Sequence, residues 1–399
     1  MNIFSKIYCR TYQGIMRFVL PLMPYREPKI LESVEEIAPV LIDKGIKNVL
    51  LVTDKGIQDL GLTKTLEKSL KDSEINYVIF NEIVPNPTTV NVENGLSVYN
   101  DNTCQAIIAM GGGSVMDCAK VIGARAVNPK KSINKMKGLL KVKYPLPPLF
   151  AIPTTAGTGS ETTVTAVITD SITHHKYTIN DFDLIPQYAV LDPKLTLGLP
   201  KGLTATTGMD ALTHAIEAFI GNSTTDSTRK NALEAARLII ENLPKVMEDG
   251  SNERARSNML RASYMAGLAF TKSYVGYNHA IAHSLGGKYG VAHGLANAII
   301  LPYMLAEYGS TIYSKLKVMA VYCNVARPYD NEQMATSKFI NRILEMNEYF
   351  GIPKVFDCIK EEDIPDMAKK AAKEANPLYP VPKLMSSKEL EKMYYKIKA

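Results

Sequence analysis

Four of the six histidines in the 399-residue chain lie with an aspartate in two short stretches, and these residues are the first candidates for chemistry. Asp210 and His214 are four residues apart, as are His279 and His283, and this spacing places two side chains on one face of a helix. His293 follows a glycine-containing turn. Burying several imidazoles and a carboxylate costs free energy unless something pairs them, and a divalent metal does so. This set suits Fe(II) or Zn(II) better than Ca²⁺ or Mg²⁺, although spacing alone leaves open which three histidines bind.

A glycine-rich turn between a strand and a helix is the first candidate for cofactor binding. An apolar run over residues 106–110 enters Gly111, Gly112 and Gly113, and Ser114 then precedes a predicted helix over residues 115–126. Glycines let the backbone approach a phosphate, and the helix N-terminus attracts an anion. A simple tight turn is the alternative, since the run is neither the GxGxxG fingerprint nor a Walker loop.

A second loop, over residues 154–161, also follows an apolar strand and is rich in hydroxyl groups. Thr154, Thr155 and Thr158 offer donors to phosphate, ribose or carboxamide groups, although plain helix capping is an alternative. Asp54 directly follows another strand, where an acid typically binds the ribose hydroxyls and disfavours a 2′-phosphate. An ordinary turn aspartate is the alternative there. Together the loops predict a nucleotide site that prefers NAD to NADP.

The pattern of apolar residues differs between the two halves of the chain. Apolar runs at 47–54, 76–80, 106–110, 148–153 and 188–191 alternate with helical stretches, which predicts an α/β domain with a Rossmann-like parallel sheet over residues 28–200. Residues 201–399 show only helical spacing and are predicted to form an all-helical, metal-binding domain. Residues 1–27 are predicted to be an amphipathic, helical extension. The favoured interpretation is a helix that packs on the rest of the protein or on a second subunit, and the alternatives are a membrane-surface helix or a transit peptide.

Composition narrows the class of protein. The net charge is +6, from 46 basic and 40 acidic residues, and the basic residues form no stripe that would indicate nucleic-acid binding. The five cysteines are dispersed, which favours reduced thiols and a cytoplasmic location. No apolar run approaches the length of a membrane span.

These stretches together resemble the iron-containing (group III) alcohol dehydrogenase family, on residues 84–88, 111–117, 153–161, 208–217 and 279–302. The resemblance runs from about residue 28 to the C-terminus and implies a dehydroquinate synthase-like fold, with a nucleotide domain followed by a helical domain. It implies four metal ligands, namely Asp210, His214, His279 and His293, and places His283 close to the nicotinamide. It further implies cofactor contacts by Asp54, Asn86, Gly112, Gly113, Ser114, Thr154, Thr155, Thr158 and, on weaker local similarity, Lys176.

The resulting hypothesis is a metal-dependent, NAD(H)-linked alcohol dehydrogenase acting on a small primary alcohol or diol, or on the aldehyde in reverse. His283 is the candidate for relaying the alcohol proton to solvent, since imidazole titrates near neutral pH. Alternatives are a glycerol-type polyol dehydrogenase, or a dehydroquinate synthase-like enzyme, which the apolar residues beside the ligands disfavour. A non-catalytic assembly subunit is more remote, because the ligand set is intact. We expect a homodimer or higher homo-oligomer.

Overall fold

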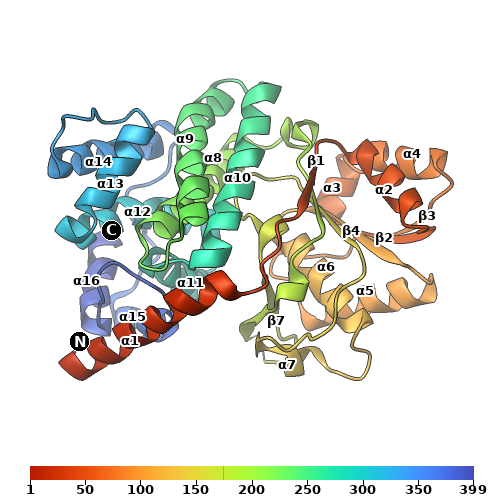
Figure 1. The fold of residues 1–399 in the computed structure, drawn as a ribbon, viewed down its shortest axis with the longest axis horizontal. Helices are drawn as coiled ribbons and strands as arrows, with labels where there is room; N and C mark the ends of the chain where they lie inside the picture. The colour runs from red at the N-terminus through yellow and green to blue at the C-terminus, as the bar shows by residue number, and fades with distance from the viewer. Residues whose placement is uncertain (174) are drawn as a thin grey trace. The chain divides into compact units, whose positions relative to one another are not determined.

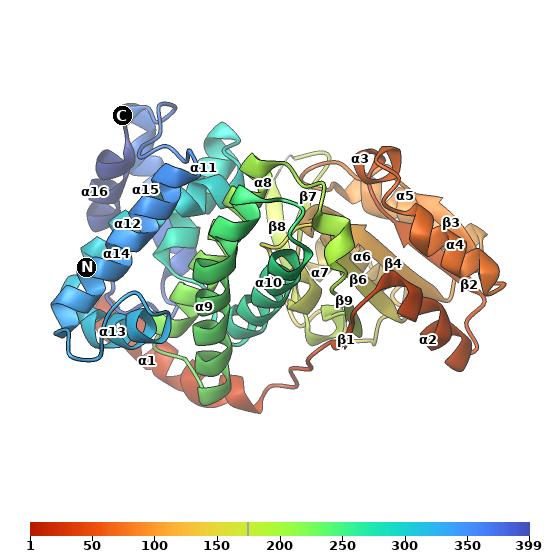
Figure 2. The same cartoon turned by 90° about the horizontal axis from the view of Figure 1, so that it is seen from above.

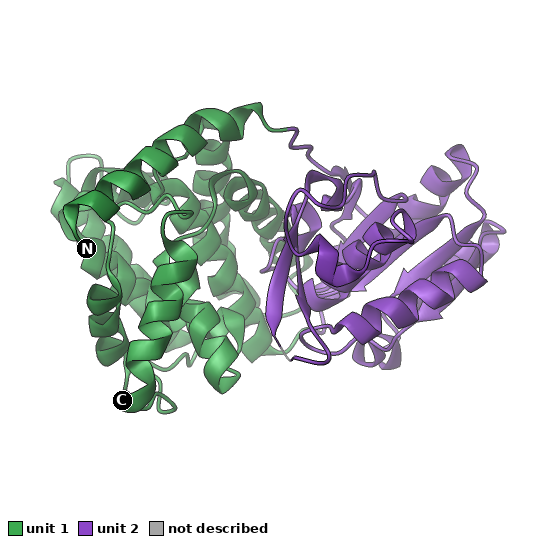
Figure 3. Ribbon diagram, turned by 90° about the horizontal axis from the view of Figure 1, so that it is seen from below, with its two compact units in different colours: residues 1–23, 199–399 green, residues 24–198 purple. Residues whose placement is uncertain are grey.

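The computed structural model describes residues 1–173 and 175–399. It divides into two compact units, residues 24–198 and residues 1–23 with 199–399, which are described separately (Figure 3). The sequence predicted domain boundaries at residues 27/28 and 200/201, whereas the boundaries of the two units fall at residues 23/24 and 198/199. The N-terminal segment is therefore grouped with the helical unit in space.

The unit of residues 24–198 is built on a six-stranded, parallel sheet in the order β1-β9-β6-β4-β2-β3. Its strands are β1 (Lys29–Leu31), β2 (Asn48–Val52), β3 (Asn76–Phe80), β4 (Ala106–Gly111), β6 (Leu149–Pro153) and β9 (Tyr188–Val190). The five apolar runs correspond to five of these strands, which confirms the predicted α/β fold. The edge strand β1 was not predicted, because three residues carry too little pattern.

Helices cover both faces of this sheet, which explains why its strands are apolar throughout. In β2, Leu50 and Val52 face one core, and Val49 and Leu51 face the other. Figure 1 shows α5 and α6 on one side of the sheet and α2 and α4 on the other. The helices of this unit are α2 (Ile37–Asp43), α3 (Lys55–Asp59), α4 (Lys64–Asp72), α5 (Thr89–Asp101), α6 (Gly113–Ala126) and α7 (Ile133–Met136), with short 3-10 turns η2 (Val34–Glu36), η3 (Ser160–Thr162), η4 (Phe182–Leu184) and η5 (Pro193–Thr196).

A small second sheet in the same unit was not predicted. It has the order β5-β8-β7 and comprises β5 (Gly138–Leu139), β7 (Thr165–Thr169) and β8 (Lys176–Asn180). β7 and β8 pair antiparallel, and alternate residues of each are buried. β7 has only three consecutive apolar residues and β8 alternates polar and apolar residues over only five positions, so both lack the longer apolar signal of the main sheet.

The second unit is helical, as predicted. Its helices are α8 (Lys201–Ile220), α9 (Asp226–Glu248), α10 (Glu253–Ser273), α11 (Tyr277–Tyr289), α12 (His293–Tyr308), α13 (Tyr313–Tyr322), α14 (Glu332–Tyr349), α15 (Ile364–Ala375) and α16 (Ser387–Ile397), with η6 (Gly309–Thr311) and η7 (Glu361–Asp363). Thr225, Asn252, Asn331 and Ser386 cap helix N-termini with their side chains. α8, α9 and α10 lie side by side (Figure 2). α8 approaches α9 so closely that a methyl group on Gly208 would lie 2.7 Å from Leu243.

Residues 1–23 belong to this unit through α1 (Ile3–Val19) and η1 (Leu20–Leu22). Cys9, Gln13 and Leu20 are buried. Gln13 Nε2 donates to the carbonyl of Tyr379 at 2.7 Å, and the Arg10 guanidinium donates to the carbonyls of Val381 and Pro382. Polar contacts across most of the chain length thus fix one face of α1 against the unit.

Candidate active site

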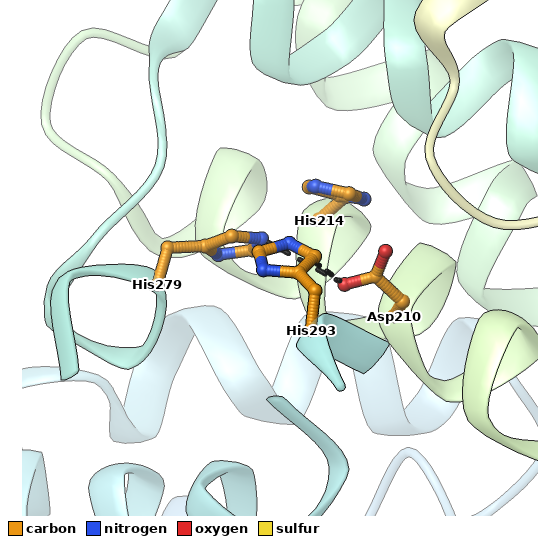
Figure 4. Close-up of side chains that lie close together, drawn as sticks. All are labelled: Asp210, His214, His279 and His293. Atoms are coloured by element: carbon orange, nitrogen blue, oxygen red, sulfur yellow. Dashed lines mark ion pairs between the residues drawn. The ribbon is translucent and has the colours of Figure 1, made fainter. Parts of the chain in front are cut away.

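Helices α8, α11 and α12 bring four predicted ligands together. Asp210 and His214 lie one turn apart on α8, His279 lies in the first turn of α11, and His293 begins α12. One potential ligand atom from each residue lies within 4.8 Å of those of the other three. Figure 4 shows the four side chains directed toward a common space. The spatial convergence expected from the sequence is therefore present, and metal coordination by these residues stays a prediction.

The spacing within the cluster fits an ion between the side chains. Asp210 Oδ1 lies 3.9 Å from His279 Nε2 and 3.5 Å from His293 Nε2. The rings of His214 and His279 stack with centroids 4.5 Å apart. Asp210, His214 and His279 are buried, whereas the His293 side chain is 40% exposed. The cluster thus has a closed interior and one side open to solvent.

Electrostatics also indicates that a cation belongs in the cluster. Burial raises the pKa of Asp210, while His214 and a hydrogen bond from Asn297 oppose the rise. Burial, followed by repulsion from the neighbouring histidines, holds the pKa of His279 well below its usual value. His279 is therefore a neutral imidazole, and its buried Nε2 accepts no hydrogen bond from any described residue. A divalent cation would bind this lone pair and stabilise the Asp210 carboxylate, so the residues fit a metal.

Glu217 holds the ring of His279 in this orientation. His279 Nδ1 lies 2.6 Å from Glu217 Oε2, and the backbone N–H groups of Gly276 and Asn278 donate to the same carboxylate at 2.8 and 2.9 Å. Because Nδ1 donates to Glu217, the lone pair of His279 lies on Nε2, toward the cluster. No role for Glu217 was predicted from the sequence. Its position, seven residues after Asp210 and on the same helical face, was the available signal.

Asn297 supports the opposite side of the cluster and was also missed. Its Nδ2 donates to Asp210 Oδ1 at 2.6 Å and lies 3.1 Å from His293 Nε2. Asn278 Nδ2 in turn donates to Asn297 Oδ1 at 2.9 Å. Asn297 lies four residues after His293, so the two side chains share a face of α12.

His283 lies beside the cluster and outside it. Its ring stacks on His293 with centroids 5.2 Å apart, and its Nδ1 lies 2.7 Å from Glu374 Oε1. The side chain is 43% exposed. A proton acceptor next to the ligands that also reaches solvent has the placement that a relay requires, and the catalytic role of His283 stays a prediction.

The two predicted cofactor loops of the other unit contact each other at the carboxyl ends of β4 and β6. Gly112 precedes α6, and a methyl group on Gly113 would lie 3.2 Å from Thr158 and one on Gly112 3.8 Å from Thr155 Oγ1. The N–H of Thr154 donates to the carbonyl of Gly111 at 3.2 Å. Ser114 lies in the first turn of α6. The structure therefore brings these predicted contacts to the end of the sheet where the parallel strands have their carboxyl ends, which is where parallel α/β sheets bind ligands.

The remaining predicted contacts lie on neighbouring strands and loops of the same unit. Asp54 follows β2, which is next to β4, and its carboxylate caps α3 by accepting the N–H of Ile57 at 3.0 Å. Asn86 has a left-handed backbone, with φ of 59°. Lys176, at the start of β8, donates to Asn86 Oδ1 at 2.7 Å. Lys176 thus lies beside another predicted contact, although its local sequence signal was weak.

A buried hydrogen-bond network joins the two loops and was missed. Lys120 on α6 is fully buried and donates from Nζ to Ser160 Oγ at 3.1 Å and to Thr163 Oγ1 at 2.7 Å. Asp117, one turn earlier, accepts from Ser160 Oγ at 2.9 Å. The helix that starts at the glycine turn is thereby tied to the end of the hydroxyl-rich loop. Glu161 is also buried there, and burial raises its pKa to about 7.

Comparison with known proteins places the chain in one family. Residues 30–193 match the family described as iron-containing alcohol dehydrogenase, and residues 204–397 match the C-terminal part of the Fe-containing alcohol dehydrogenase family. A 1,3-propanediol dehydrogenase of Citrobacter freundii is 37% identical over 94% of this chain and 97% of its own length. The NAD-dependent methanol dehydrogenase of Bacillus methanolicus is 37% identical over 85% of this chain and 89% of its own.

A comparison with solved structures supports the same family. The structure of a 1,3-propanediol oxidoreductase is 35% identical, covers 94% of this chain and 98% of its own, and superposes with a TM-score of 0.89. The chain therefore belongs to the iron-containing alcohol dehydrogenase family. It is an NAD-dependent alcohol oxidoreductase, as the sequence predicted.

Proposed function

We propose that this chain interconverts a small primary alcohol or diol and the corresponding aldehyde, with a divalent metal held by Asp210, His214, His279 and His293. One observation carries the proposal: four groups from three helices converge, and the buried Nε2 of His279 accepts no hydrogen bond from the described part of the chain. The family description favours Fe(II), and the same donor set also suits Zn(II).

The chain's own residues prepare the chemistry. When bound, a metal would supply Lewis-acid polarisation of the alcohol oxygen, and NAD would supply the hydride acceptor. Glu217 and Asn297 fix the orientation of His279 and Asp210. His283, whose Nδ1 lies 2.7 Å from Glu374 Oε1 and whose side chain is 43% exposed, is proposed to take up the alcohol proton and to release it to solvent.

The nucleotide contacts are proposed for the other unit. We infer that the backbone of Gly112, Gly113 and Ser114 binds the pyrophosphate at the start of α6. Thr154, Thr155, Thr158, Asn86 and Lys176 supply further polar contacts, and Asp54 binds the ribose hydroxyls. The support is that Asp54, the glycine turn and the hydroxyl-rich loop follow the carboxyl ends of the neighbouring strands β2, β4 and β6, and that Lys176 donates to Asn86.

The test combines metal analysis with turnover. Protein purified anaerobically should contain one divalent ion per chain, and His279→Ala should lose the ion and the activity. NADH formation is then followed with methanol, butanol, 1,3-propanediol and glycerol, and NADH consumption is followed with lactaldehyde. Full activity after exhaustive chelation would refute the metal role. Preference for glycerol would favour the polyol alternative over the relatives' alcohol and propanediol activities.

Assembly and location are proposals as well. We propose a cytoplasmic homodimer or higher homo-oligomer that joins through an open edge of the main sheet, at β1 or β3. All five cysteines are free and four are buried, which suits a reducing compartment. No helix among the described residues has the length and apolar character to cross a membrane. Light scattering after size exclusion gives the subunit number.

A further inference from the structure

Helix α1 and the turn that follows it carry an apolar face that nothing in the described chain covers. Cys9, Gln13 and Leu20 point into the unit. The opposite face exposes seven large hydrophobic residues: Ile3, Phe4, Ile7, Tyr8, Ile15, Phe18 and Leu22, with Phe4 and Phe18 each 80% exposed. No other described stretch of similar length exposes as many. Single exposed hydrophobic residues are ordinary, but a contiguous stripe marks a binding surface.

The charged side chains of α1 itself are all positive, and the acidic Glu389 of α16 lies beside the N-terminal amine and near Lys6. Lys6, Arg10 and Arg17 lie along one flank of α1, and the chain has no acidic residue before Glu27. Arg10 is bound to backbone carbonyls, whereas Lys6 and Arg17 are exposed. Lys315 lies close enough to Arg17 and Arg10 for their charges to repel. The surface is therefore apolar with a basic border, which complements a partner that is apolar and anionic.

Pairing of α1 with a second copy in an antiparallel, two-fold contact fits this pattern poorly. A two-fold axis in that arrangement places each flank against the same flank of the other helix. Lys6 and Arg17 of one copy would then lie on the same side of the contact as Arg17 and Lys6 of the other copy, and like charges placed together are destabilising. The pattern of basic residues along one border of an apolar face is instead typical of helices that lie in a membrane interface.

The anchoring of α1 holds its apolar face outward. Arg10 and Gln13 bind carbonyls of residues 377–382, and α1 runs along an outer edge of its unit (Figures 1 and 3). The match to the family begins at residue 30, so α1 lies outside the fold shared with the other dehydrogenases. The helix thus precedes the residues that match the family, and hydrogen bonds to residues 379–382 hold it against its unit.

We propose that α1 binds the surface of an anionic lipid bilayer, with its apolar face in the headgroup layer and Lys6 and Arg17 against lipid phosphates. Interfacial helices bind through buried apolar area together with attraction to anionic lipid. The protein would then associate peripherally with a membrane, independently of its metal and its cofactor.

The experiment is sedimentation of the full-length protein with vesicles of phosphatidylcholine, with or without about one-third phosphatidylglycerol. We expect binding to the anionic vesicles and at least about tenfold weaker binding to neutral ones. Phe4→Asp with Phe18→Asp should abolish binding. The matched control replaces Leu60 and Tyr329, each 74% exposed outside α1, by aspartate and should bind like the wild type. Equal turnover of all variants verifies folding.

Two further measurements make the proposal refutable. Lys6→Glu with Arg17→Glu should remove the preference for anionic vesicles, and an unchanged preference would overturn the electrostatic part. Absence of vesicle binding, or binding that survives Phe4→Asp with Phe18→Asp, would overturn the proposal. If these aspartates instead reduce the size of the oligomer in light scattering and the wild type binds no vesicles, the face is a contact with a second copy.

Discussion

Replacing Glu217 by glutamine should weaken metal binding without removing any proposed ligand. The carboxylate accepts three donors, from Gly276 N–H, Asn278 N–H and His279 Nδ1. Glutamine keeps one oxygen and presents an NH₂ group in place of the other. At least one buried donor then faces a donor, and the site has no room to adjust, because a methyl group on Gly276 would lie 2.5 Å from Glu217 Oε1.

Two independent estimates give a similar magnitude. A buried donor left without an acceptor costs about 1–3 kcal/mol. Loss of an outer partner of a metal-bound histidine lowers metal affinity about 10–100-fold, which is about 1.4–2.7 kcal/mol. We therefore expect Glu217→Gln to raise the metal dissociation constant about 10–100-fold.

The assay is equilibrium competition for the metal against a chelator of known affinity. Glu161→Gln is the matched control, since Glu161 is equally buried but lies in the other unit, and its carboxylate oxygens accept no hydrogen bond within residues 1–173 and 175–399. If Glu217→Gln retains the metal as tightly as Glu161→Gln and the wild type do, then Glu217 does not orient His279 and the reasoning fails.

Three further predictions concern other buried groups. Lys120→Met should raise the KM for NAD about tenfold, with a smaller change in kcat, because it removes the hydrogen bonds that join the two cofactor loops. Lys120→Arg should raise the KM less than Lys120→Met does. An unchanged KM in Lys120→Met would contradict a role of Lys120 in positioning the loops. The folded state holds the pKa of Glu161 near 7, above its ordinary 4.5, so the folded protein binds the extra proton and loses stability as pH rises through this window. Glu161→Gln should therefore resist urea better than the wild type at pH 8, with a gap that narrows toward pH 5; a constant gap would argue against the shift. A methyl group on Gly294 would lie 2.5 Å from the carbonyl oxygen of Thr206. Gly294→Ala should therefore push α12 away from α8 and lower the metal affinity at least about tenfold. Gly287→Ala is the control and should leave the metal affinity unchanged, because a methyl group on Gly287 has no atom within 4 Å.

The sequence predicted those parts of the site that depend on local spacing. Asp210 and His214 share a helical face at a four-residue separation, and the glycine turn follows a strongly apolar strand. The same reasoning gave the parallel sheet, because its strands are buried on both faces. The strands β7 and β8 were not predicted, because each has only five residues and neither is apolar throughout.

The residues that escaped prediction act through contacts between distant segments. Glu217 acquires its function from backbone donors 59 and 61 residues away. Lys120 is a helical lysine, which is ordinarily solvated, and only the fold buries it against Ser160 and Thr163. An acid and a base three residues apart, Asp117 and Lys120, within a largely apolar helix were the local sign of this network.

The distance along the chain between α1 and its anchoring carbonyls affects synthesis. Arg10 binds the carbonyl of Val381, 371 residues later. At typical translation rates of about 5–20 residues per second, α1 leaves the ribosome about 20–75 s before its partner exists. During that interval the face that carries Cys9, Gln13 and Leu20 is uncovered together with the apolar face, so the nascent chain is a target for chaperones or for premature association, and residues 24–198 have time to fold first.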